Sequence, residues 1–228
     1  NQKINDLNSL KDEENAWYTK YHFISHSGGG IDGKEYSNSL EAWSNSYNRG
    51  NRIIDADLLL TSDKKVILKH GNNINIELNE IPIKDSTIIK RNNGTSVFEI
   101  NDYELSYNEF MTNKIYNKYT PMSLESMIEF MIEHPDLYVS VDANDNIVEI
   151  YNYLLDYVNT INHKEILNNI IVSIYTLEDL NNILEIYNFN NIVIRQYSNH
   201  EYNWYELFQI CINNNIHAYQ NHFKMLPT

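Results

Sequence analysis

The chain has little cysteine and few basic residues. Its 228 residues include one cysteine, Cys211, which excludes an internal disulfide and a zinc site built on several thiolates. Only 17 Lys and Arg stand against 31 Asp and Glu, and a surface of this charge repels nucleic acid and anionic membranes. We therefore expect no nucleic-acid partner.

Long apolar runs are also missing. No stretch of about 18 apolar residues occurs, so we expect no transmembrane segment. The chain begins at Asn1 without a signal-peptide pattern, but a removed targeting segment would leave no trace, so the cytoplasm and the cell envelope both stay open. The length suits a single domain over residues 1–228. The oligomeric state stays open as well.

Short β-rich runs alternate with segments whose apolar residues recur every three or four positions. This pattern is typical of β/α units with a parallel sheet. The predicted strands are 21–25, 52–60, 65–70, 137–142, 170–175, 191–196 and 216–220. The predicted helices are 39–49, 123–133, 147–159, 177–187 and 204–214, and Ser123 is the expected N-cap of the second. Residues 71–119 break the alternation, and we interpret them as an insertion that forms either a lid or a surface excursion with a short hairpin.

Two acidic residues lie inside an apolar strand. Alternation places Asp55 and Asp57 on one face, about 7 Å apart at roughly 3.3 Å per residue. Buried carboxylates are costly unless they are paired or bind a cation, so this spacing favours a metal site over a capping role. Asp142 ends another apolar strand. The carboxyl ends of barrel strands converge, so the three acids could bind one Mg²⁺ or Ca²⁺.

Two histidines follow predicted strands. His26 follows the first strand and opens a glycine run at 28–30, and His70 closes the third strand. Both are expected on the same face, where a histidine can give or take a proton near neutral pH. Taken singly, each is as compatible with a structural role. The glycine run lacks the spacing of a P-loop and predicts only a loose loop.

At these positions the sequence resembles the glycerophosphodiester phosphodiesterase family. The motifs that carry the resemblance are, in chain order, His26-Ser27-Gly28, the segment 37–43, Asp55-Ala56-Asp57, Thr61-Ser62-Asp63, His70-Gly71, the segment 121–125 and Val141-Asp142-Ala143-Asn144. The resemblance implies an α/β fold, a (β/α)8 barrel of TIM type. Seven strands are predicted where that barrel has eight, which indicates a truncated chain or a barrel left open at the C-terminus.

The resemblance implies a phosphoric diester hydrolase. It implies His26 and His70 as general acid and base, and a divalent cation, Mg²⁺ or Ca²⁺, on Asp55, Asp57 and Asp142. The substrate would be a small-molecule or lipid-derived phosphodiester, with a glycerophosphodiester or a related lipid or polymer head group as the expected class. The alternative is a catalytically impaired barrel that binds a metal ion or a head group.

Several family positions differ in this chain. Asp55 and Asp142 stand where the family pattern has glutamates. Ser27 replaces an arginine, Asn144 a lysine and Gly71 an aspartate, so two cationic groups that would hold the substrate phosphate are missing. Asn144 and Arg195 are the predicted substrate-binding residues. Arg195 either supplies the missing positive charge or forms an ordinary ion pair with a surface acid.

Overall fold

The computed structural model describes residues 16–70, 87–90, 96–99, 106–143, 146–196, 204–214, 216 and 218–221. Its centre is a six-stranded sheet in the order β2-β1-β5-β6-β7-β8. The strands are β1 (Ile53–Leu60), β2 (Val66–Leu68), β5 (Tyr138–Asp142), β6 (Ile170–Ile174), β7 (Asn191–Gln196) and β8 (Ala218–Asn221). All neighbours from β1 to β8 run parallel, and β2 is antiparallel to β1.

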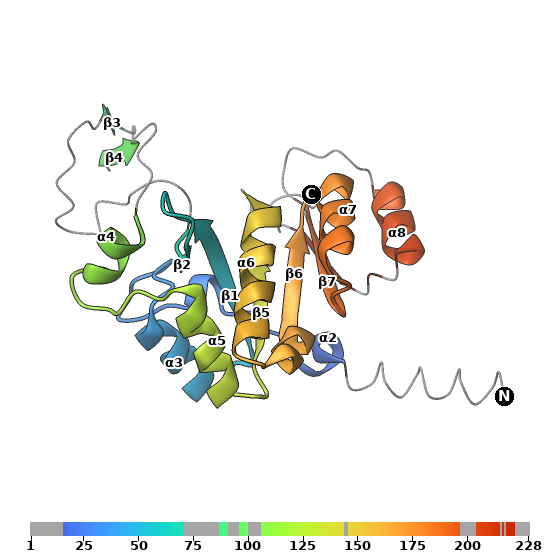
Figure 1. Ribbon diagram of the computed structural model, residues 1–228, viewed down its shortest axis with the longest axis horizontal. Helices are drawn as coiled ribbons and strands as arrows, with labels where there is room; N and C mark the ends of the chain where they lie inside the picture. The colour runs from blue at the N-terminus through green and yellow to red at the C-terminus, as the bar shows by residue number, and fades with distance from the viewer. Residues whose placement is uncertain are drawn as a thin grey trace, which may run out of the picture.

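Helices alternate with the parallel strands, as the apolar spacing predicted. They are α3 (Leu40–Asn48), α5 (Leu124–Glu133), α6 (Ile147–Thr160), α7 (Leu177–Ile186) and α8 (Trp204–Asn213). Each begins and ends within one residue of its predicted bounds. The Ser123 hydroxyl accepts a hydrogen bond from the Ser126 amide, which confirms Ser123 as an N-cap. Figure 1 shows α6 in front of β5, α3 and α5 at the lower left beside β1, and α7 and α8 on the right.

The two faces of the sheet differ in chemistry because side chains alternate along each strand. One face packs on the helices and forms the main core, to which the sheet contributes Ile54, Ala56, Leu58, Val139, Val141, Ile170, Val172, Ile174 and Ile194. The opposite face carries buried polar groups, namely Asp55, Asp57, Ser140, Asp142, Ser173 and Arg195. The polar groups therefore lie on the side of the sheet that faces away from the helical layer.

An apolar cluster lies on the polar face, toward the amino ends of the strands. Trp17 of the short helix α2 (Trp17–Lys20) packs there with Ile53, Ile171 and Val193. Its indole nitrogen donates to the Asn191 side chain at 3.0 Å. Ile53 and Val193 precede the buried residues Asp55 and Arg195 by two positions each. The apolar cluster therefore lies directly beside the buried polar groups, on the side of the amino ends of the strands.

The predicted strand 21–25 is wrong in extent. Only Ser25 pairs with the sheet, through a parallel bridge to Ile54. Tyr21 directly follows α2, and Phe23 and Ile24 are 78% and 44% exposed, so the segment lacks the buried face that a full strand would need.

The predicted third strand is confirmed in place but not in direction. The pattern of parallel β/α units required a helix before it, whereas a short turn joins β1 to β2 and makes them an antiparallel hairpin. Because β2 runs back along β1, its end returns to the level of Asp57, where the Lys69 amide donates to the Asp57 carbonyl at 2.8 Å.

The region interpreted as an insertion contains described elements of its own. β3 (Thr87–Lys90) and β4 (Ser96–Glu99) pair as two antiparallel strands. The lid and the surface excursion both stay predictions. Helix α4 (Tyr107–Thr112) was not predicted, although Ser106 and Glu109 form a capping box at its start. Phe110 of this helix packs with Ile67 in a separate apolar cluster. The other residues of 71–105 lie outside the described part.

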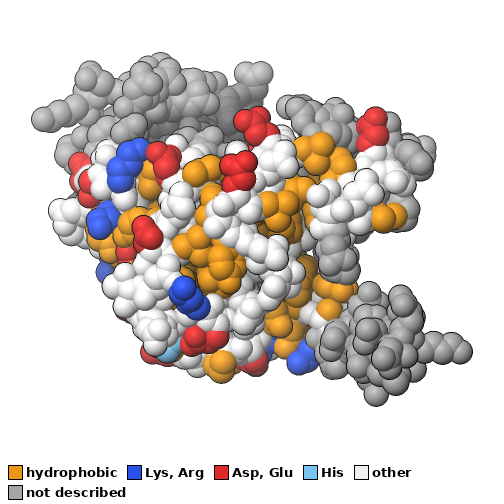
Figure 2. Space-filling view, turned by 45° about the vertical axis from the view of Figure 1, so that its right-hand side comes forward, with side chains coloured by type: hydrophobic (Ala, Val, Ile, Leu, Met, Phe, Trp, Pro, Cys, Tyr) orange, Lys and Arg blue, Asp and Glu red, His pale blue; other side chains and the backbone are white. Residues whose placement is uncertain are grey.

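The described surface is mixed in character. Figure 2 shows acidic and basic side chains scattered singly over the drawn face, with apolar side chains reaching the surface between them. Among the helices that the structure describes, none combines the length and the apolar character needed to cross a membrane.

The packing of α5 gives a first prediction. Ile128 is fully buried in the main core, whereas Ile132 on the same helix is 38% exposed. Ile128→Ala should lower the free energy of unfolding by about 2–5 kcal/mol, because it removes buried methyl groups and leaves a cavity. Ile132→Ala should change it by only about 0.5 kcal/mol. Urea unfolding of both variants measures the difference, and equal costs would contradict the assigned burial.

Candidate active site

The backbone ladder beside β1 positions His26. The Ser25 amide donates to the Ile53 carbonyl at 3.0 Å, and the Asp55 amide donates to the Ser25 carbonyl at 2.9 Å. The chain then turns through the short helix η1 (His26–Gly28), in which Ser27 has a left-handed φ of 48°. The His26 ring consequently projects outward, with its side chain 57% exposed and its Nε2 atom 4.0 Å from Asp55 Oδ2.

His70 reaches the same place from the other direction. It follows β2, whose antiparallel course brings it back beside β1. The ring centroids of His26 and His70 lie 6.1 Å apart. The two predicted catalytic histidines are therefore neighbours at the exposed rim of the site.

Tyr36 completes a triangle with the two histidines. Its ring centroid lies 5.1 Å from that of His26 and 4.8 Å from that of His70. The Tyr36 backbone has a φ of 58°, which is uncommon for an aromatic residue and costs free energy. The ring is also 44% exposed, so an exposed aromatic side chain is held at the rim in a strained conformation.

Asp57 lies beneath the rim and binds two neutral donors. Its Oδ2 atom accepts hydrogen bonds from the Ser27 hydroxyl at 2.6 Å and from the Asn38 amide nitrogen at 2.7 Å. Asn38 is fully buried, and its backbone amide donates to the Ser27 carbonyl at 3.0 Å. These contacts tie η1 and the segment before α3 to the carboxylate.

Arg195 occupies the centre of the buried acids. Its guanidinium forms ion pairs with Asp55 and Asp142, the latter at 2.8 Å, and donates to the Ser140 hydroxyl at 2.8 Å. The Tyr175 hydroxyl donates to the other oxygen of Asp142 at 2.7 Å. Arg195 comes from β7 and the two acids from β1 and β5, so a single side chain links three strands.

Burial and charge act against each other in this cluster. Burial raises the pKa values of Asp55 and Asp142, and Arg195 opposes both shifts. Burial by itself would lower the pKa of Arg195, but Asp55 and Asp142 outweigh it and the pKa is raised. The guanidinium is therefore firmly charged.

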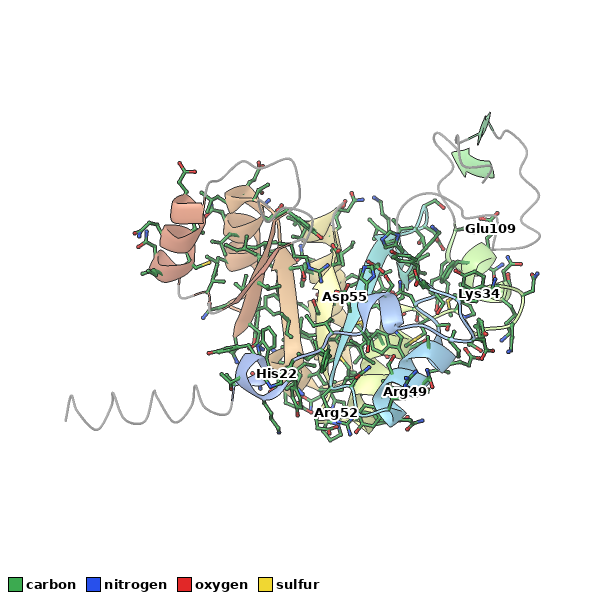
Figure 3. All side chains as sticks on the ribbon, turned by 180° about the vertical axis from the view of Figure 1, so that it is seen from behind. His22, Lys34, Arg49, Arg52, Asp55 and Glu109 are labelled. Atoms are coloured by element: carbon green, nitrogen blue, oxygen red, sulfur yellow. The ribbon has the colours of Figure 1, made fainter. Side chains whose placement is uncertain are left out.

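Lys69 is a second buried cation near these acids. It is only 9% exposed. Burial lowers the pKa of Lys69 to about 8, although the charge of Asp57 acts against the shift. Seen from behind in Figure 3, Asp55 lies beside η1 on the face turned away from the helical layer.

The sequence matches a protein-family model. The model of the glycerophosphoryl diester phosphodiesterase family matches residues 26–222, from the first histidine of the site through the last strand. The chain belongs to this family. It is thus a phosphoric diester hydrolase by family, with the TIM-barrel fold that the family has.

Solved structures agree with the fold. A phosphodiesterase from Oleispira antarctica, solved with the product sn-glycerol-3-phosphate, is 11% identical, with a TM-score of 0.61 over 92% of this chain and 78% of that one. The enzyme from Thermotoga maritima is 15% identical, with a TM-score of 0.58 over 88% and 74%. One from Parabacteroides distasonis is 14% identical, with a TM-score of 0.60 over 89% and 74%. No curated protein matches the sequence.

The described strands form an open part of the family barrel. Among the described residues, β8 and the segment at Ser25 make no pairing with each other. In the described part, the sheet thus contains six strands and two bridging residues, Ser25 and Ser123, compared with the seven predicted strands.

The site residues predicted from the sequence lie together wherever the structure describes them. His26 and His70 meet at the rim, Asp55, Asp57 and Asp142 lie below them, and all three acids are buried. Arg195 is buried with these acids and not paired with a surface acid. Asn144 lies outside the described residues, so its predicted contact with substrate stays a prediction. The catalytic, metal-binding and substrate-binding roles also stay predictions.

The family generally uses a divalent cation, and the acids do not fit one as they are arranged here. Four of the six carboxylate oxygens of the three aspartates already accept hydrogen bonds from protein donors. Within the described ranges, no three His, Cys, Asp or Glu residues are grouped to hold a metal ion. A cation on Asp55 and Asp142 would also meet the charged guanidinium of Arg195.

Sequence reasoning missed three residues of the site. Tyr36 had no signal, because only the fold places its ring between the two histidines. Ser27 stands where the family pattern has an arginine, and its hydroxyl donates to Asp57. Lys69 reads as an ordinary strand-end residue, although its position directly before His70 and opposite Asp57 explains its burial.

Gly28 gives a prediction for the rim. It has a φ of +83°, and a Cβ atom there would lie 2.7 Å from the Trp43 ring. Gly28→Ala should cost about 2–5 kcal/mol of stability, as the sum of left-handed strain and overpacking. Displacement of η1 should move His26 and lower phosphodiesterase activity by roughly 10²-fold.

Gly33→Ala is the matched control. Gly33 has a φ of +74°, but nothing lies within 4 Å of its added Cβ. The Gly33→Ala protein should therefore lose only about 1–2 kcal/mol of its free energy of unfolding and keep its phosphodiesterase activity. Thermal unfolding and turnover of both variants test the contact, and equal losses would contradict a role for the Trp43 clash.

Proposed function

We propose that the protein hydrolyses glycerophosphodiesters, with His26 and His70 as the proton-transfer pair. The observation that carries the proposal is the meeting of these two rings, 6.1 Å apart, above a buried acidic cluster. They come from opposite directions along β1, one before it and one after β2. A phosphoryl group placed between them presents its attacking and leaving oxygens to different rings.

The reaction needs one proton removed and one supplied. One histidine takes the proton of the attacking hydroxyl, from water or from the neighbouring hydroxyl of the glycerol, as a new P–O bond forms. The other protonates the alkoxide that leaves as the ester P–O bond breaks. The Oδ2 atom of Asp55 lies 4.0 Å from His26 Nε2.

Charge on the phosphate must also be balanced. The site contributes Arg195 and Lys69 as buried cations, next to three aspartates. A protonated histidine at the rim adds a third positive group that can touch the phosphate directly. The predicted Mg²⁺ or Ca²⁺ on Asp55, Asp57 and Asp142 stays a prediction.

The substrate class follows from the family and the openness of the rim. Both histidines are exposed, so a small glycerophosphodiester or a lipid-derived head group can approach from solvent. The Oleispira antarctica relative holds sn-glycerol-3-phosphate, which is the product expected here as well. A binding module without turnover is the second candidate, favoured by the two acids that Arg195 already neutralises and by Ser27 in place of an arginine.

Histidine variants test the proposal. His26→Gln and His70→Gln should each lower kcat by about 10²–10⁴, because each removes one proton transfer while keeping the size of the side chain. The assay is release of glycerol 3-phosphate from glycerophosphodiesters that differ in the alcohol, run with EDTA, Mg²⁺ or Ca²⁺.

His163→Gln is the control for the histidine variants. His163 is paired with Glu165 at 2.7 Å, outside the site, and its variant should keep full activity. Absence of release by the intact protein under every cation condition would favour the binding module. Full activity in either rim variant would remove that histidine from the mechanism.

Tyr36 is proposed to contact the substrate at the rim. Tyr36→Asn removes the ring while keeping a residue that tolerates the left-handed backbone. It should raise KM by roughly 2–10-fold with little change in kcat, the size expected for one aromatic contact. Tyr36→Phe keeps the ring and should behave like the wild type. An unchanged KM in the Asn variant would show that the ring does not touch the substrate.

A further inference from the structure

The position predicted for a metal ion is already occupied by positive charge. The acids that converge there come from neighbouring strands, and Asp57 and Asp142 are register partners between β1 and β5. Asp55 and Asp142 both point at the guanidinium of Arg195, which is only 4% exposed. Its two terminal nitrogens are divided between the two carboxylates, so the arginine bridges the acids as a bound cation would.

A divalent ion would have to compete with this arrangement. Mg²⁺ and Ca²⁺ need six or more oxygen ligands at about 2.0–2.6 Å. Asp142 offers no uncommitted oxygen, since Tyr175 and Arg195 each bind one, and Asp57 Oδ2 accepts two further donors. An ion bound between Asp55 and Asp142 would also lie within a few ångströms of a charged guanidinium.

We propose that Arg195 is the resident cation of this site and stands where a divalent ion would otherwise bind. In the intact protein, Asp55 and Asp142 are therefore not available to Mg²⁺ or Ca²⁺. Arg195 acts as a positioning residue. It holds the strand ends of β1, β5 and β7 together and fixes Asp55 beneath His26.

The inference deepens the proposed function of the same site, but its test does not require turnover. Arg195→Gln removes the charge and leaves two buried carboxylates unpaired. In EDTA its Tm should fall by about 10 °C, the shift expected when one partner of a buried ion pair is lost in a chain of this size. Millimolar Ca²⁺ or Mg²⁺ should restore at least half of that loss, because the freed acids then bind the ion.

The wild type and a matched variant supply the comparison. The wild-type Tm should not depend on Ca²⁺ or Mg²⁺, and calorimetric titration should detect no stoichiometric binding. Arg52→Gln breaks an exposed pair with Asp136 and should show a small Tm change that no cation reverses. Cation effects that come from surface acids would be equal in all three proteins.

Two results would overturn the inference. One is stoichiometric Ca²⁺ or Mg²⁺ binding by the wild type, with a Tm increase as large as in Arg195→Gln. The other is an Arg195→Gln protein that folds but gains no stability from either ion. If this variant does not fold, the wild-type titration decides alone, and Arg195→Lys, which keeps one charge, should fold and remain indifferent to cations. Loss of activity in the histidine variants tests the proposed function separately.

Discussion

Three carboxylates on one buried face of two neighbouring strands are the constraint on which the site depends. Isolated charges in such a place are unstable, and each must find a donor or a counter-charge. Asp55 and Asp142 form ion pairs with Arg195, and Asp57 accepts hydrogen bonds from Ser27 and Asn38. These contacts hold the strand ends and the segment before α3 close together.

The need of Asp57 for hydrogen-bond donors explains the backbone conformations of its two neighbours. Ser27 and Asn38 both adopt left-handed backbone conformations, with φ values of 48° and 45°, which place their side chains over Asp57. Asn tolerates such a conformation better than most residues. The irregular backbone between Ser25 and α3 is therefore stabilised by the carboxylate that it covers.

Much of the fold could be predicted from the sequence because the apolar spacing is regular. The five helices and the parallel strands from β5 onward follow from periodicity, and Ser123 from the chemistry of capping. The direction of β2 could also have been predicted, because only five residues connect β1 to β2 and a parallel neighbour needs a much longer crossover. The prediction of a strand over 21–25 was wrong in extent, because β propensity does not show that apolar side chains such as Phe23 stay exposed.

For the site, the residue types were sufficient to select the acids and the histidines but not to pair them. Carboxylates at strand ends are equally compatible with a metal ion and with an arginine from a third strand. Only the sheet order brings β7 close enough for Arg195 to reach Asp55, 140 positions away in the sequence. The sequence spacing does not predict Tyr36, because its position at the site depends on contacts with His26 and His70, which lie far apart in the sequence.

The ladder on β1 has a consequence for how this enzyme can change over time. Ser25 and Lys69 both bond to β1 through main-chain atoms, so the backbone positions next to the two histidines are set by peptide geometry. Substitutions in the helical layer on the opposite face that preserve the packing of Trp43 against Gly28 can then accumulate without moving these backbone positions. Such an arrangement allows sequences that share little identity to keep the same pair of reactive groups.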